Sequence, residues 1–218
     1  MQLFNTARDF ICDHPLSWYD SLTTTANLND QERIALLDRY MTFPRSYHSL
    51  HHIGYLWQLN MFMCFDNDII FSDNEQQKLA RAIAYHDCVY NPESTTNEED
   101  SAKVYIDQFQ EDWVSNAIIQ SKTHFARRDI STSWDVLTEW FIGLDLASLA
   151  APWNLFRANS LMIRSEYYHL SESEWKLGRK SFLQTALASR PIYQHSLFER
   201  YFEDRAINNL EQDLAELQ

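Results

Sequence analysis

The scarcity of glycine and proline constrains the fold of this chain more than any other feature of its sequence. Only 3 glycines and 5 prolines occur among the 218 residues. β-Hairpins and β-sandwiches need turn residues every few positions, and glycine and proline supply many of those turns. The hydrophobic fraction of 45% is enough to build a substantial core. We therefore predict an all-α fold, a single-domain helical bundle over residues 1–218 with its core at about 30–190.

The charge and the cysteines argue against several functional classes. A formal net charge of −13 disfavours binding to a nucleic acid polymer, because phosphate contacts need a basic surface. No segment approaches the ~18 apolar residues of a membrane span, so we predict no membrane insertion. The three cysteines, Cys12, Cys64 and Cys88, form no CxxC pair and are odd in number, which indicates a reducing compartment. We expect a cytoplasmic protein.

Capping signals mark where several of the expected helices begin. In a capping box, a polar residue caps the helix and a Glu three residues later binds back to it. This spacing occurs at Asn29–Glu32, Ser72–Glu75, Thr96–Glu99 and Ser171–Glu174. Further helices are expected at about 45–63, at about 112–124, from Ser133 onward, at about 154–170 and, as an amphipathic C-terminal helix, at about 196–217.

Polar residues lie within the apolar stripes of three expected helices. His48 and His52 are four residues apart in the first of them, so we expect them to share one face. His86 and Asp87 close the second, and Asp145 lies in the third. A buried carboxylate costs several kcal/mol unless it is paired, so a positive group should lie beside each Asp. Together these side chains offer enough nitrogen and oxygen donors for a divalent metal ion.

Each of these residues has a simpler interpretation when it is taken alone. A single His on an apolar face is usually a core or surface residue with one hydrogen bond. An Asp in an apolar stripe often pairs with an Arg or caps a helix. The combination is more specific, because the order His, His-Asp, Asp falls on successive expected helices.

The combined pattern resembles the HD superfamily of metal-dependent phosphohydrolases, which is named for its His…His-Asp…Asp signature. More closely, it is similar to a group of small bacterial predicted HD-domain phosphohydrolases. The segments that carry the resemblance are Arg45-Ser46-Tyr47-His48-Ser49-Leu50-His51-His52-Ile53, Ala84-Tyr85-His86-Asp87-Cys88-Val89-Tyr90, Asn97-Glu98-Glu99-Asp100-Ser101-Ala102, Asp145-Leu146-Ala147, Ile163-Arg164-Ser165-Glu166-Tyr167 and Gly178-Arg179. The resemblance implies a helical bundle of HD-domain type.

The resemblance also implies a role for each residue of the signature. The four metal ligands of the superfamily match, in this sequence, His52, His86, Asp87 and Asp145. The spacing of His48 and His52 is similar to that in cyclic-nucleotide phosphodiesterases, where the first His protonates the leaving oxygen. His48 is therefore the expected general acid. The implied reaction is hydrolysis of a phosphate ester by metal-activated water, which Asp87 or Asp145 would orient.

The implied ligands are a small phosphorylated substrate and a divalent ion. The ligand types suit Mn, Mg, Co, Ni, Zn or Fe, and the sequence does not choose among nucleotides, cyclic nucleotides and sugar phosphates. Arg45 is a candidate phosphate clamp, because its guanidinium fork matches phosphate oxygens, or else a surface residue at a helix start. Glu98 either reaches the site from the loop after Asp87 or caps a helix. Arg164 either binds substrate or pairs with Glu166.

Two positions bear on whether a second metal ion binds. Gly143 stands where the similar bacterial group often has an acid, which weakens the case for a second ion. His124, with Asp129 nearby, is the one further His at a suitable place. A second ion would favour an HD-fold di-iron oxygenase. The other alternative is a non-catalytic helical metal-binding interaction protein that uses the 196–217 helix as a partner or homodimer surface.

Overall fold

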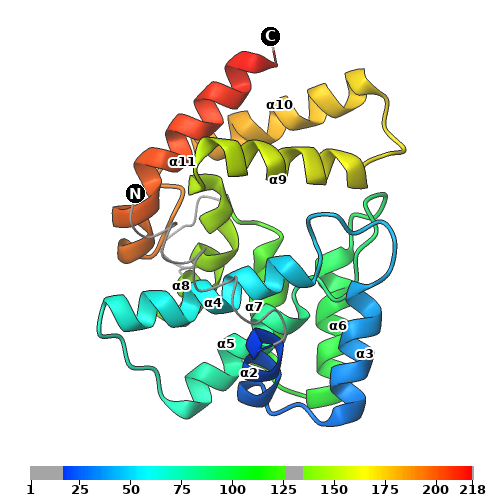
Figure 1. The fold of residues 1–218 in the computed structure, drawn as a ribbon, viewed down its shortest axis with the longest axis vertical. Helices are drawn as coiled ribbons and strands as arrows, with labels where there is room; N and C mark the ends of the chain where they lie inside the picture. Colours follow the sequence, from blue (N-terminus) through cyan, green and yellow to red (C-terminus); the bar gives the residue numbers. More distant parts are fainter. Residues whose placement is uncertain (1–16, 126–134, 218) are drawn as a thin grey trace. The chain divides into compact units, whose positions relative to one another are not determined.

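The computed structural model describes residues 17–125 and 135–217, and these residues form helices with no strand among them (Figure 1). The predicted all-α class is therefore confirmed. The chain divides into two compact units, Met1–Lys122 and Thr123–Gln218, which we describe separately. A single domain over residues 1–218, and its HD-domain type, stay predictions. Cys12, Asp129 and Ser133 lie outside the described residues.

The first unit is organised around helix α5. Its described helices are α2 (Ser17–Thr25), α3 (Asp30–Tyr40), α4 (Leu50–Asp66), α5 (Asp73–Tyr85), α6 (Asn97–Phe109) and α7 (Asp112–Ser121). Helix α5 packs against α2, α4, α6 and α7. Its C-terminal half is buried on all sides, and Leu79 and Ile83 are completely inaccessible. Burying side chains of this size contributes about 1.5–3 kcal/mol each, so the end of α5 is a firmly held position.

Three of the four expected capping boxes form. The Asn29 side chain accepts from the backbone N–H of Glu32 at 3.1 Å, and the Asn29 N–H donates to the Glu32 carboxylate at 2.7 Å. Ser72 and Ser171 make the same pair of bonds with Glu75 and Glu174. Each box satisfies N–H groups that would otherwise be free at the helix start.

The expected capping box at Thr96 is wrong. In the described part of the chain, the Thr96 side chain makes no bond to the backbone of α6, and its hydroxyl donates to Asp100 at 2.9 Å. Glu99 accepts instead from the Lys122 ammonium at 2.6 Å. A side-chain partner from α7's end therefore replaces the local bond that the sequence spacing suggests.

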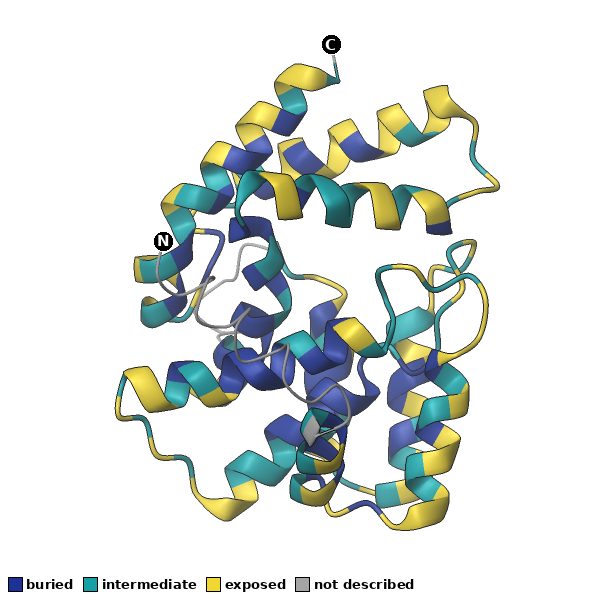
Figure 2. Cartoon of the chain, viewed as in Figure 1, coloured by how far each residue is buried: buried dark blue, intermediate teal, exposed yellow. Residues whose placement is uncertain are grey.

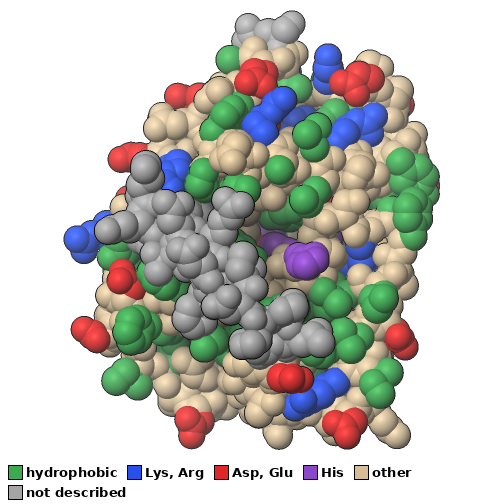
Figure 3. Space-filling view, in the orientation of Figure 1, with side chains coloured by type: hydrophobic (Ala, Val, Ile, Leu, Met, Phe, Trp, Pro, Cys, Tyr) green, Lys and Arg blue, Asp and Glu red, His purple; other side chains and the backbone are tan. Residues whose placement is uncertain are grey.

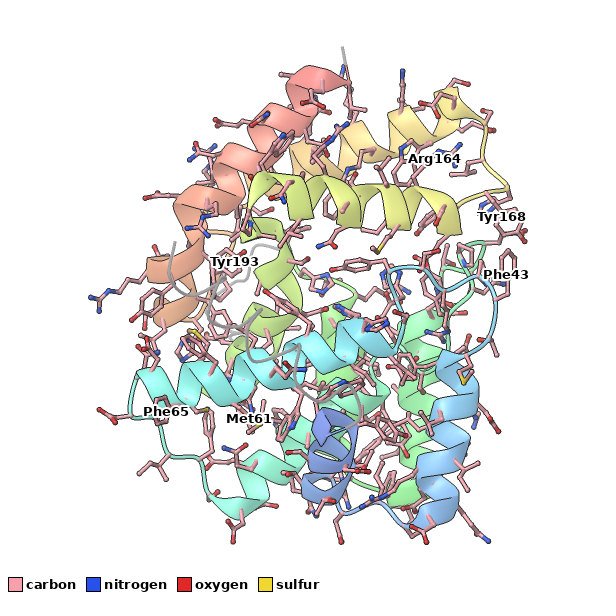
Figure 4. All side chains as sticks on the ribbon, in the orientation of Figure 1. Phe43, Met61, Phe65, Arg164, Tyr168 and Tyr193 are labelled. Atoms are coloured by element: carbon pink, nitrogen blue, oxygen red, sulfur yellow. The ribbon has the colours of Figure 1, made fainter. Side chains whose placement is uncertain are left out.

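The second unit surrounds a cluster of aromatic rings. Its described helices are α8 (Val136–Leu146), the 3-10 helix η2 (Ala147–Ala150), α9 (Trp153–Glu166), α10 (Glu172–Ala188) and α11 (Ser196–Glu216). The expected 196–217 helix is thus present as α11, which packs on α8, η2 and α10. Tyr193, labelled in Figure 4, donates its hydroxyl to the Leu146 carbonyl at 3.1 Å. Its ring stacks on that of Phe198, with the centroids 6.4 Å apart, and both residues are completely buried.

Membrane insertion finds no support in the helices. None of the helices within residues 17–125 and 135–217 is both long enough and apolar enough to cross a bilayer. Both units instead alternate buried and exposed helix faces (Figure 2). Exposed faces carry large apolar residues in places, and Phe65 at the end of α4, labelled in Figure 4, is 84% exposed.

Candidate metal centre

Three of the four expected ligands meet in the first unit. His52 lies in the first turn of α4, His86 is the C-cap residue of α5, and Asp87 follows it. Both histidines are buried, and the Asp87 side chain is 17% exposed. The packing of α4 against α5 brings these residues together, although 34 positions separate the histidines in sequence.

The possible ligand atoms of these residues lie close to one another. The Nε2 atom of His86 is 3.1 Å from Oδ2 of Asp87 and 3.3 Å from Nε2 of His52, and the third distance, from His52 to Asp87, is 3.8 Å. Ligands that bind one ion at about 2.0–2.2 Å lie about 2.8–3.6 Å from one another in octahedral or tetrahedral sites, so two of the three distances are in this range and the third is slightly longer. The three side chains could therefore hold a metal ion.

A backbone carbonyl prepares His86 for this role. Its Nδ1 atom is 3.0 Å from the carbonyl oxygen of Ile83, one turn earlier in α5. A neutral imidazole that donates there carries its proton on Nδ1, which leaves the lone pair of Nε2 directed at the cluster. Histidines that bind metals are usually oriented by such a bond from the other ring nitrogen.

The environment of Asp87 keeps its carboxylate charged. Burial alone would raise the pKa of Asp87, but the charge and the hydrogen bond of the adjacent His86 in its protonated form oppose it, together with the charges of His48 and His52 when they are protonated. The net result holds the pKa of this carboxyl well below its ordinary value. An ionised carboxylate is the form that binds a metal.

The expected helix at 45–63 begins later than predicted, at Leu50, with Ser49 as its N-cap. His48 therefore precedes the helix, and the prediction that one helical turn joins it to His52 is wrong. The two rings nevertheless lie near one another, with their centroids 6.2 Å apart. The His48 imidazole stacks on the ring of Tyr90 at 4.4 Å, a partner that the sequence analysis missed.

The side chain of Arg45 holds the segment before α4 against the loop after α5. Its guanidinium donates to the backbone carbonyls of His48 at 2.8 Å, Asp87 at 2.9 Å and Cys88 at 3.3 Å. The N–H of its Nε atom donates to the Thr42 hydroxyl at 3.3 Å. Bonds to residues more than 40 positions away hold residues 45–49 in a turn, and no local sequence pattern reports them.

The fourth expected ligand, Asp145, belongs to the second unit and lies at the end of α8. Its carboxylate is 2.7 Å from Nε2 of His124, and both side chains are partly buried. The helix expected at about 112–124, which would end at His124, is α7; it ends earlier, at Ser121, and His124 follows it in the sequence. Coordination by Asp145 alongside His52 and His86, and any ligand role for His124, stay predictions.

Gly143 has a packing reason that accounts for the missing acid. A Cβ atom at this position would lie 2.6–2.9 Å from three ring carbons of Phe198. Phe198 belongs to α11, and its ring is completely buried where this helix packs on α8. Any side chain at residue 143 would overlap that ring, so the close approach of α11 excludes an acid two residues before Asp145.

The remaining expected substrate-binding residues have structural partners of their own. Glu98 lies half-buried in the first turn of α6, and it adds to the negative charge that surrounds Lys122. Arg164, labelled in Figure 4, donates to the carbonyls of Tyr167 at 2.8 Å and Leu170 at 3.1 Å. Its ion-pair partner is Glu172 at 3.6 Å, rather than the expected Glu166. Substrate contacts by Glu98 and Arg164 stay predictions.

Comparisons with known proteins add no family to this description. No protein-family model, curated protein or solved structure matches the chain. Function is therefore inferred from the chemistry and geometry of the site. Figure 3 shows histidine side chains (purple) at the surface of the face that it draws, where they are accessible to solvent.

Proposed function

We propose that the protein is a metal-dependent hydrolase of phosphate esters that acts on a nucleotide or another small phosphorylated metabolite. The observation that carries this proposal is the convergence of His52, His86 and Asp87 within 3.1–3.8 Å of one another. Two imidazoles and one carboxylate, or the same set with Asp145, would leave coordination positions for water and substrate on a six-coordinate ion, whereas structural metal sites are normally closed by protein ligands.

Each residue of the site has a task in this reaction. His52, His86 and Asp87 would hold the divalent ion, with Asp145 as the fourth ligand. When bound, the ion supplies polarisation of the phosphoryl group and lowers the pKa of a coordinated water toward about 7. Asp87 accepts a hydrogen bond from the attacking water and so orients it toward phosphorus.

His48 is the proposed general acid. It is half-buried, and the centroid of its ring lies 6.2 Å from that of His52, so the imidazole lies close to the cluster. Cleavage of a phosphate ester leaves negative charge on the departing oxygen, and a proton from His48 would neutralise it. General acid catalysis of this kind typically contributes about 10²–10⁴-fold to the rate.

The test is a hydrolysis assay on phosphate monoesters and diesters with the protein loaded with Mn or Co. We expect activity in the parent and its loss in the double variant His86→Ala/Asp87→Ala. His51→Ala is the matched control, because His51 is exposed on α4 beside His52. A folded double variant that hydrolyses these esters as fast as the parent would show that the proposed function is wrong.

The role of Asp145 needs its own variant. We expect Asp145→Ala to weaken binding of Mn at least tenfold, because even the loss of a hydrogen-bond partner of a ligand typically costs about 10–100-fold in metal affinity and this variant would remove a ligand itself. His124 is its partner at 2.7 Å, so His124→Ala serves as the comparison. Equal metal affinity in Asp145→Ala and the parent would remove Asp145 from the ligand set.

A further inference from the structure

A stack of side chains connects α3, the turn before α4 and the loop after α5. The guanidinium carbon of Arg45 lies 4.9 Å from the centre of the Tyr40 ring and 5.4 Å from that of Tyr90. The Tyr90 ring in turn stacks on the His48 imidazole, at 4.4 Å and an interplanar angle of 27°. A cation is attracted to the face of an aromatic ring, and offset stacked rings attract each other, so each contact in the stack is favourable.

Hydrogen bonds to backbone carbonyls hold Arg45 and Tyr40 of this stack in place beside the candidate metal centre. One Nη atom of Arg45 donates to the carbonyls of His48 and Asp87 together, at 2.8 and 2.9 Å. The backbone of the proposed general acid is thereby tied to the backbone of a proposed metal ligand. The Tyr40 hydroxyl adds a bond to the Ala84 carbonyl at 3.1 Å, which joins α3 to the end of α5.

The rings around His48 leave its imidazole little freedom. Tyr90 contacts it face to face, and Tyr47 contacts it edge to face at 5.0 Å. The centroid of the His52 ring lies 6.2 Å from that of His48, with the two rings nearly perpendicular. A His in a turn would otherwise rotate freely about two side-chain bonds, and its ring nitrogens would seldom point at a leaving group.

We propose that Tyr90 is a positioning residue for His48, and that Arg45 braces this pair instead of clamping phosphate. The inference rests on the proposed function, because it assigns the group that orients the general acid of that reaction. The Tyr90 ring supplies a flat face parallel to the imidazole, and the hydroxyl of Tyr90 is not needed for this contact. Arg45 makes four hydrogen bonds within the protein, so its guanidinium has a structural role at the site that needs no bound phosphate.

The size of the effect follows from what orientation contributes to catalysis. A misplacement of about 1 Å can reduce a rate about 100-fold. Loss of the Tyr90 ring leaves His48 present but unrestrained, so we expect Tyr90→Leu to lower kcat about 10- to 100-fold with little change in KM. Tyr90→Phe keeps the ring and should lose no more than about threefold.

Two esters with different leaving groups distinguish a misplaced acid from a damaged fold. The assay compares phenyl phosphate, whose leaving oxygen needs a proton, with 4-nitrophenyl phosphate, whose leaving group departs readily as an anion. We expect Tyr90→Leu and His48→Ala to slow phenyl phosphate far more than 4-nitrophenyl phosphate. The double variant Tyr90→Leu/His48→Ala should be no slower than His48→Ala, because the two residues act as one unit.

Phe109→Leu is the matched control for loss of a stacked ring. Phe109 stacks on Tyr105 at 4.9 Å and carries the guanidinium of Arg81 at 4.5 Å, so it copies the Tyr90 arrangement elsewhere in the same unit. We expect this variant to slow both esters equally or not at all. An equal loss on both esters in Tyr90→Leu, as from general damage, would overturn the proposal.

A measurement without turnover separates this inference from the proposed function. Stacking on Tyr90 should shift the ring protons of His48 in nuclear magnetic resonance spectra, an effect kept in Tyr90→Phe and lost in Tyr90→Leu. If the parent hydrolyses no ester while this pattern holds, the proposed function is wrong and the stack itself is supported. If the His48 signals are identical in Tyr90→Leu and the parent, the positioning role is wrong even in an active enzyme.

Discussion

Replacing Gly143 by alanine is a sharp test of how the second unit packs. The added Cβ would lie 2.6, 2.8 and 2.9 Å from three carbons of the Phe198 ring. Ordinary carbon contacts are about 3.5–4.0 Å, so the ring would have to move by about 1 Å. It has little room to do so, because Phe198 is fully buried and its neighbours include the rings of Trp140 at 5.1 Å and Phe202 at 5.6 Å.

Two opposing contributions set the size of the stability change that we expect for Gly143→Ala. Overpacking a close-packed core by one methyl group typically costs about 1–3 kcal/mol, and this rigid site belongs at the upper end. Alanine in place of glycine in a helix interior returns about 1 kcal/mol through helix propensity. The net expected loss is therefore about 2 kcal/mol in the free energy of unfolding. For a chain of this length it corresponds to a fall of about 4–8 °C in Tm.

Gly178→Ala is the internal control, and its effect should have the opposite sign. Gly178 is exposed in the middle of α10, and no described atom lies within 4 Å of a Cβ built there. Helix propensity then acts alone and should raise stability by about 1 kcal/mol. Chemical unfolding followed by circular dichroism measures both variants. A Gly143→Ala protein as stable as Gly178→Ala would refute the steric argument at Phe198.

Further predictions concern thiols and a buried ion pair. Burial raises the pKa of both Cys64 and Cys88 to about 11, so their thiols stay protonated at pH 8. They should label with a disulfide reagent about 100-fold more slowly than in the unfolded chain, and the rate should climb as the pH approaches 11. Asp213→Ala should cost about 3 kcal/mol of unfolding free energy, since it strands the buried guanidinium of Arg179, which lies 2.8 Å from the Asp213 carboxylate. Replacing both partners by apolar residues should restore most of that loss in urea unfolding.

Local signals in the sequence predict much of the fold. Low glycine and proline content indicates helices, and the boxes at Asn29, Ser72 and Ser171 fix three helix starts to the residue. These signals work because the bonds involved span three residues. Thr96 fails by the same logic, since Lys122 from another helix takes Glu99 as its partner and changes the local balance.

The candidate site is only partly readable from sequence. The order of His52, His86 and Asp87 in apolar stripes points to the cluster, because buried polar residues need partners wherever they lie. The start of α4 at Leu50 cannot be read from the local sequence. The segment before it is bound through Arg45 to the carbonyls of Asp87 and Cys88, which are distant in the sequence.

Other contacts depend on how segments distant in the sequence approach one another. The stacking of Tyr90 on His48 arises only when the loop after α5 meets the turn before α4. The need for glycine at residue 143 appears only once α11 is seated against α8. Single-sequence reasoning has access to the composition of these segments and not to their approach.

Metal content is the measurement that tests the central claim most directly. Elemental analysis would compare the parent, purified without added metal, with His86→Ala and with the control His51→Ala. We predict about one or two divalent ions per chain in the parent and in His51→Ala, and their loss in His86→Ala. No metal in the parent, even after reconstitution with Mn or Co, would contradict the account and return His52, His86 and Asp87 to the status of polar groups in the core.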